Sequence, residues 1–152
     1  MATVVWPAGD QAGAHGDWTF VDLSGRYTKL TGTFLGAGTS YKPDHMYHKG
    51  QPYADKKQRC SRCRWIEVRL FSETATDRYL LVTRGASAVP GETERVTCTL
   101  VHGPFQAVEA ATTRREEPGG EPFLIRPAAM ALAQAAQHDK AVKEAYVNRA
   151  VA

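Results

Sequence analysis

A chain of 152 residues with 43% hydrophobic and 23% charged residues has the size and composition of one ordinary globular domain. A net charge of +3 does not define a strongly basic or acidic protein, and three cysteines are too few for a secreted disulfide scaffold. No apolar run approaches the ~20 residues that cross a bilayer, and the N-terminus lacks a basic leader followed by an apolar stretch. The sequence therefore predicts a protein that stays in the cytoplasm.

The first part of the chain predicts a hairpin behind an irregular lead-in. Residues 1–16 contain one proline and three glycines with little periodicity, which predicts a poorly ordered N-terminal segment ahead of a single domain over 17–152. Segments 17–23 and 26–35 have strand composition, and the Ser-Gly turn between them favours a hairpin. A loop then runs over 36–63 with little periodicity, and a loop of that length inside a domain is usually functional or disordered.

The rest of the chain predicts more strands and one helix. Alternation of apolar and polar residues indicates strands at 64–71, 77–85 and 93–101, with a further candidate at 104–114. A polar connector over 115–122 is expected to be flexible, and a run rich in good helix formers predicts one long helix over 127–150. The fold class is therefore α+β, with five to six mostly antiparallel strands, a long inserted loop carrying a zinc-knuckle-like His/Cys cluster, and one long C-terminal helix.

The inserted loop contains two pairs of metal-type ligands. His45 and His48 are three residues apart, and Cys60 and Cys63 form a C-x-x-C pair after eleven intervening residues. Two thiolates and two neutral imidazoles are a ligand set that structural zinc takes in a tetrahedron. Arginines on either side of the cysteines would lower the thiol pKa values and favour the ligating form. The sequence therefore predicts a structural zinc ion held by these four residues.

Other interpretations of the same residues stay open. Cys98 and His102, spaced C-x-x-x-H, are the main rival ligands, although Cys98 also fits the apolar face of a predicted strand. A redox pair would need C-x-x-C at the start of a helix, whereas a strand follows it here. Two free thiols without a function are the simplest alternative. Asp44-His45 beside a C-x-x-C resembles the HNH endonucleases, although the order of the two parts is reversed.

Positive charge is concentrated around the same loop. Between Tyr41 and Leu70, eight Lys or Arg residues and three acidic residues give +5, whereas the remaining eleven bases and thirteen acids give −2. The leading hypothesis is a non-catalytic accessory protein whose basic loop binds another macromolecule. The alternative is nucleic-acid binding by 41–69, with cations on phosphates and aromatic rings on bases; a metal-dependent nuclease is less favoured. The residues expected to contact the partner are Tyr47, Tyr53, Lys56, Lys57, Arg59, Arg62 and Arg64.

Signatures of other enzyme classes are absent from the sequence. There is no P-loop or nucleophile elbow, and Gly36-Ala37-Gly38 lacks the third glycine of a dinucleotide motif. The alanine-rich C-terminal helix would allow a homo-oligomer if its outer side met a second copy. The run from His45 through QRCSRCRWIEVRLF resembles small proteins of actinobacteria and their phages, and this resemblance implies a phage-type accessory or interaction protein.

Overall fold

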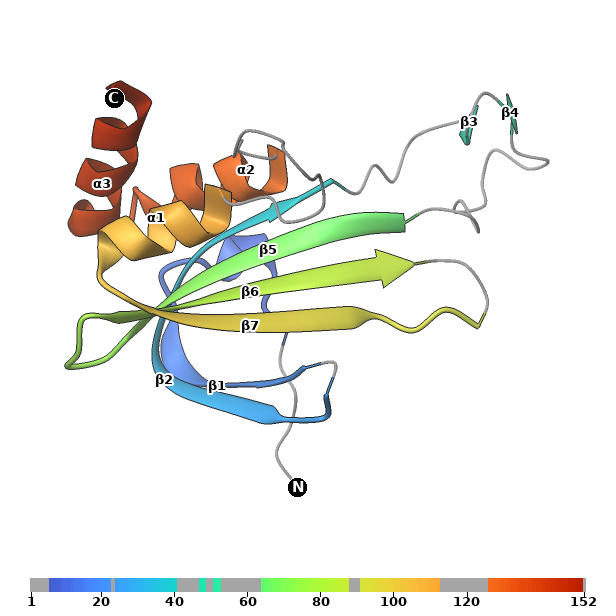
Figure 1. Ribbon diagram of the computed structural model, residues 1–152, viewed down its shortest axis with the longest axis horizontal. Helices are drawn as coiled ribbons and strands as arrows, with labels where there is room; N and C mark the ends of the chain where they lie inside the picture. Colours follow the sequence, from blue (N-terminus) through green and yellow to red (C-terminus); the bar gives the residue numbers. More distant parts are fainter. Residues whose placement is uncertain are drawn as a thin grey trace.

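The computed structural model of the chain describes residues 6–22, 24–40, 47–48, 51–52, 64–87, 91–112 and 126–151. The elements in these ranges, drawn in Figure 1, are the 3-10 helix η1 (Gly9–Gln11), the strands β1 (His15–Val21), β2 (Tyr27–Thr39), β3 (Tyr47–His48), β4 (Gln51–Pro52), β5 (Arg64–Glu73), β6 (Arg78–Ser87) and β7 (Arg95–His102), and the helices α1 (Pro104–Thr112), α2 (Arg126–Ala135) and α3 (Lys140–Val151). Among the described residues, none of the helices has both the length and the hydropathy of a membrane span.

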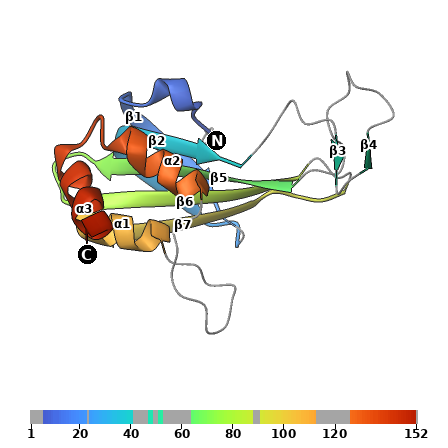
Figure 2. The same ribbon diagram turned by 90° about the horizontal axis from the view of Figure 1, so that it is seen from above.

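The core of the fold is an antiparallel meander. Five strands form one sheet in the order β1-β2-β5-β6-β7, so each strand pairs with its neighbours along the chain once the short β3–β4 ladder is set aside. All three α-helices lie against the same side of this sheet (Figures 1 and 2). The predicted α+β class is therefore confirmed, with five antiparallel strands in the sheet.

One face of the sheet, called the helix face below, is covered by the helices. Its core is mainly aliphatic because alternate strand residues meet small helix residues there. Burying one such Leu or Val side chain stabilises the fold by about 1.5–3 kcal/mol. The buried side chains of this layer are Leu35, Val68, Leu70, Tyr79 and Leu81 from the strands, and Ala107, Val108, Ala131, Leu132, Ala135, Val142 and Ala145 from the helices.

The opposite face, called the hairpin face, is aromatic because the β1–β2 hairpin curls across it and β1 reaches β7. Trp18, Phe20, Phe34 and Phe71 pack with ring centroids 5.2 to 6.0 Å apart in tilted and edge-on arrangements. Aromatic rings prefer such offset contacts over direct stacking. This cluster fixes the hairpin against β5 and so holds the curvature of the sheet.

The N-terminal segment closes the hairpin face. The Trp6 ring meets the Phe20 ring edge-on at 6.0 Å between centroids. Farther along, the Gly13 amide donates to the Phe34 carbonyl at 2.7 Å. Residues 6–16, which belong to the segment expected to be poorly ordered, contain η1 and the first residues of β1.

β2 extends farther than the sequence indicated. Residues Gly36–Thr39, assigned above to the loop, pair with β5 instead. Helix α2 rests directly on this part of the strand. A Cβ at Gly36 would lie 2.3 Å from the Ala131 carbonyl oxygen, and one at Gly38 would lie 1.8 Å from the Pro127 carbonyl oxygen. Because these two glycines have no side chain, the backbones of α2 and β2 can lie in close contact.

The strand predicted over 104–114 is wrong, because α1 forms there. Gly103, with φ of +87°, turns the chain at the end of β7. Pro104 then occupies the first helical turn, where its missing N–H breaks no helical hydrogen bond. Ala107 and Val108 are buried against the sheet.

The single long helix predicted over 127–150 is also wrong, because α2 and α3 divide it. Asp139 lies at the break and caps α3, since its Oδ1 accepts a hydrogen bond from the Val142 amide at 3.1 Å. Its Oδ2 accepts a second bond from the Tyr79 hydroxyl at 2.9 Å. The anchored carboxylate thus starts a new helix in a stretch rich in helix formers.

Candidate functional site

Most of the residues predicted to bind zinc or a partner lie outside the described ranges. Three exceptions belong to strands: Tyr47 and His48 form β3, and Arg64 begins β5. The predicted site residues outside the described ranges are His45, Tyr53, Lys56, Lys57, Arg59, Cys60, Arg62 and Cys63. The connector predicted over 115–122 lies outside them as well.

The β3–β4 ladder is the described part of the inserted segment. Tyr47 pairs with Pro52, and His48 pairs with Gln51, in antiparallel register. Figures 1 and 2 both place this ladder beyond the end of the sheet at which β2 stops and β5 starts. The chain therefore reverses direction between His48 and Gln51, ahead of the C-x-x-C pair.

The two ends of the inserted segment are tied together at the sheet. The Ser40 amide donates to the Ile66 carbonyl at 2.9 Å, and the Ile66 amide donates to the Ser40 hydroxyl oxygen at 2.9 Å. Thr39 pairs with Glu67 in the ladder between β2 and β5. These four residues are called the loop root below. They join the chain on either side of segment 41–63 at one end of the sheet.

A charge cluster lies on the hairpin face beside the loop root. Arg84 Nη1 is 3.1 Å from Glu67 Oε2, and Arg84 Nε is 2.6 Å from Glu94 Oε2. Glu67 Oε2 and Arg84 Nε are buried yet make no hydrogen bond of good geometry, so these contacts are ion pairs without aligned donors. Glu67 and Arg84 side chains are only 16% and 26% exposed, which reduces their screening by water. The cluster ties the start of β5 to β6 and to residue 94.

Arg69 lies deeper on the same face and is buried. Its Nε donates to the Pro7 carbonyl at 2.8 Å, and its guanidinium carbon lies 4.6 Å from the centre of the Trp6 ring. Burial lowers the pKa of Arg69, an effect that the charge of Glu67 opposes. Arg69 was one of the eight bases counted between residues 41 and 70, and its burial removes it from the surface that a partner can reach.

The strand β7 keeps Cys98 and His102, the rival ligand pair, too far apart to bind one ion together. Cys98 and His102 both belong to β7 and lie four residues apart, which in a strand separates them by about 13 Å. Cys98 packs against the aromatic cluster, where burial raises the pKa of its thiol and a hydrogen bond with Thr28 opposes that rise. The two residues therefore cannot hold one ion together. Within the described part of the chain, no three His, Cys, Asp or Glu residues gather as metal ligands.

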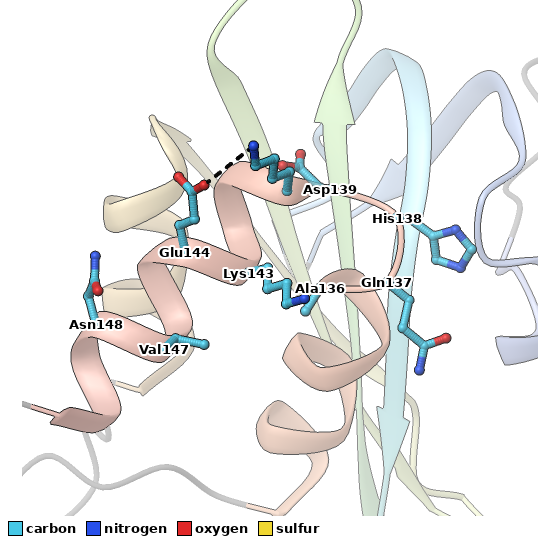
Figure 3. A pocket seen from close by; sticks show the side chains of 9 residues that line it. Ala136, Gln137, His138, Asp139, Lys143, Glu144, Val147 and Asn148 are labelled. Atoms are coloured by element: carbon cyan, nitrogen blue, oxygen red, sulfur yellow. Dashed lines mark ion pairs between the residues drawn. The ribbon is translucent and has the colours of Figure 1, made fainter.

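An open hollow lies where α2 ends and α3 begins. Its lining mixes both charges, with Lys143 and Glu144 on α3 and Asp139 at the break (Figure 3). Asp139 already bonds the Tyr79 hydroxyl and the Val142 amide. The hollow therefore shows no convergent set of groups for catalysis or for one class of ligand.

The chain shares no match with a protein-family model, a curated protein or a solved structure. Its class is defined by its own architecture: an α+β protein in which a five-stranded antiparallel meander carries three helices on one face and an inserted segment at one end.

Sequence reasoning missed the residues around the loop root. Glu67 and Arg84 come from β5 and β6 and Glu94 directly precedes β7, and the sequence offers no local sign that they meet. Gly85 was the last residue of the strand predicted over 77–85, whereas β6 continues to Ser87 and so places this glycine inside a strand.

Proposed function

We propose that this chain is a small non-catalytic accessory protein that binds a partner macromolecule through the basic loop 41–63. A structural zinc ion, held by His45, His48, Cys60 and Cys63, would organise that loop. The supporting observation is the loop root, where Ser40 and Ile66 exchange two hydrogen bonds of 2.9 Å.

The proposal has a physical basis in the cost of ordering the loop. Fixing one residue's backbone costs roughly 1–2 kcal/mol, so 23 residues between Ser40 and Arg64 need an internal source of stability. Zinc bound by thiolates and imidazoles supplies folding free energy directly. The described part of the loop already forms an antiparallel ladder between β3 and β4.

Metal stoichiometry tests the zinc assignment. Protein purified without a histidine tag should contain about one zinc per chain by elemental analysis. Cys60→Ser should lose the metal and keep the circular dichroism of the sheet, whereas the matched control Cys98→Ser should keep both. Full zinc content in Cys60→Ser would remove the ligand assignment. Thiol labelling adds a second readout, because the half-buried Cys98 with its raised pKa should react slowly, so fast labelling that appears after zinc removal would report Cys60 and Cys63.

Nucleic acid is the second candidate partner, and the six Lys or Arg and two Asp residues of segment 41–63, a net charge of +4, favour it. Anisotropy of a labelled single-stranded oligonucleotide, measured from low to physiological salt, tests this candidate. Binding should weaken steeply with salt if loop cations contact phosphates, and Arg62→Ala with Arg64→Ala should flatten the dependence. Absence of binding at low salt would leave a protein as the partner.

A further inference from the structure

Gly85, in β6, is a glycine that the fold itself does not require. Among the described residues, a Cβ there would meet Arg95 atoms at 3.8 and 3.9 Å, which is ordinary van der Waals contact. Its φ lies outside the left-handed region, so any residue can adopt this backbone. Gly36 and Gly38 differ, because a Cβ at either would overlap the backbone of α2. Since a glycine inside a strand weakens the strand, Gly85 calls for a cause outside the fold, such as close approach of another chain.

The surroundings of Gly85 are open and partly apolar. Strand register places Ile66, Gly85 and Arg95 in one row across β5, β6 and β7, and all three lie on the helix face. Met130 of α2 stands over Gly38, which is the strand neighbour diagonal to Ile66. Ile66 is 40% exposed and Met130 is 41% exposed, so two large apolar side chains are exposed on this face, and Ile66 is the ladder partner of Gly85.

Positive charge flanks this apolar pair. Arg95 is exposed at the far side of Gly85, and Arg126 is exposed on α2. Arg126 precedes Met130 by four residues and therefore shares its side of the helix. Among the described residues, neither arginine takes part in an ion pair. Glu94, which directly precedes β7, pairs with Arg84 on the opposite side of the sheet.

We propose that this surface, called the Gly85 surface (Ile66, Gly85, Arg95, Arg126 and Met130), binds an extended acidic segment of a protein partner. The backbone of that segment passes over Gly85, an apolar side chain covers Ile66 and Met130, and carboxylates pair with the two arginines. The exposed apolar pair favours a peptide over a nucleic acid, whose phosphates gain nothing from Ile and Met. The Gly85 surface contains no proposed zinc ligand and no residue of segment 41–63, so it can be tested separately from the proposed function.

Blocking the surface without disturbing the fold is feasible. Gly85→Val adds a branched side chain at a position where its Cβ would make ordinary van der Waals contacts with the described residues. The variant should unfold at the same temperature as the wild type or at a slightly higher one. Gly16→Val is a matched control in β1, because a Cβ there meets only the Trp18 ring at 3.9 Å and faces the opposite side of the sheet. Arg95→Glu reverses the charge beside Gly85.

The first measurement is fluorescence anisotropy with a labelled peptide of ~12 residues that alternates Glu and Leu. A peptide with Gln in place of Glu and an oligo-dT strand serve as comparisons. We expect saturable binding of the acidic peptide, weakened about tenfold or more by Gly85→Val and by Arg95→Glu. Gly16→Val and the zinc-site variant Cys60→Ser should bind within about twofold of the wild type.

Several outcomes would overturn the proposal. These are no saturable binding of the acidic peptide at millimolar concentration, equal binding by Gly85→Val, and tighter binding of oligo-dT than of the peptide. Amide chemical shifts provide the second measurement, since peptide binding should move the signals of Ile66, Gly85 and Met130. Shifts confined to 41–63 would assign the peptide to the basic loop and reject the Gly85 surface.

Discussion

The Tyr79 hydroxyl and the Asp139 carboxylate join the sheet to the start of α3 through a hydrogen bond of 2.9 Å. Tyr79 is 7% exposed, so its hydroxyl depends on this acceptor, and the same carboxylate caps α3 through the Val142 amide. The Asp139 side chain therefore accepts the hydrogen bond of a buried phenol and also caps the start of α3.

This arrangement predicts unequal effects of three substitutions. Asp139→Ala removes the cap and leaves the Tyr79 hydroxyl unpaired, so the free energy of unfolding should fall by about 2–4 kcal/mol. Tyr79→Phe removes only the bond and should cost about 1 kcal/mol, and Asp139→Asn should cost less than Asp139→Ala because the amide oxygen still caps. Urea unfolding measures all three. Equal stability of Asp139→Ala and Tyr79→Phe would contradict the dual role.

Stability should also fall at alkaline pH because of Tyr79. Burial, reinforced by the bond to Asp139, raises the pKa of Tyr79 well above its ordinary value of 10.0. The folded state therefore keeps the phenolic proton while the unfolded state releases it above about pH 10, and stability falls by up to about 1.4 kcal/mol per pH unit. Thermal unfolding from pH 8 to 11 measures the slope. Tyr79→Phe should reduce this slope, and an unchanged slope would assign the loss to other groups.

Gly38→Ala should be severely destabilising. Its Cβ would lie 1.8 Å from the Pro127 carbonyl oxygen, so α2 must move off β2 or the strand must bend. We expect a loss of at least about 3 kcal/mol in the free energy of unfolding. Gly16→Ala, in the same sheet but facing only an aromatic ring at 3.9 Å, is the control and should be close to neutral. A Gly38→Ala protein as stable as this control would mean that α2 is not seated as described.

Arg69 should act as the anchor of the N-terminal segment. Arg69→Ala removes the donor to the Pro7 carbonyl and the cation beneath the Trp6 ring. Residues 6–14 should then exchange their amide hydrogens faster and become open to protease, with a loss of about 1–3 kcal/mol. Arg95→Ala, at an exposed position, should change neither property. Unchanged exchange in Arg69→Ala would show that the aromatic contacts alone hold the segment.

The predicted strands follow from alternation, because β5 and β6 bury alternate side chains in two different layers, and partly buried side chains of β7 pack against both layers. The α1 segment misled the same reasoning, since its buried Ala107 and Val108 are adjacent in sequence while Phe105 is 63% exposed. The break after α2 depends on Tyr79, which is 60 residues away from Asp139. The only local trace of that break was an Asp placed before Lys-Ala-Val, which is a usual cap position.

Some residues of the candidate site could be identified from the sequence, and others could not. The spacing of His45, His48, Cys60 and Cys63 is a local pattern, so the sequence could nominate a metal site without knowledge of the fold. Arg69 looked like one more solvated base, because its acceptor on Pro7 lies 62 residues earlier. Gly36 and Gly38 lie against the backbone of α2, whereas Gly85 makes only ordinary contacts with the described residues. This difference depends on the fold and has no sign in the sequence.

The loop root has a consequence for how this sheet can change. β2 and β5 are neighbours whose pairing continues to Thr39 and Glu67, so segment 41–63 can be exchanged without removing a strand pair from the five-stranded sheet. Closing a longer loop costs only about 0.6 kcal/mol for each doubling of its length. Inserts of very different size and sequence can therefore be grafted between Ser40 and Arg64. The sequence of the inserted segment can therefore diverge faster than that of the five-stranded sheet, because the sheet does not depend on it for strand pairing.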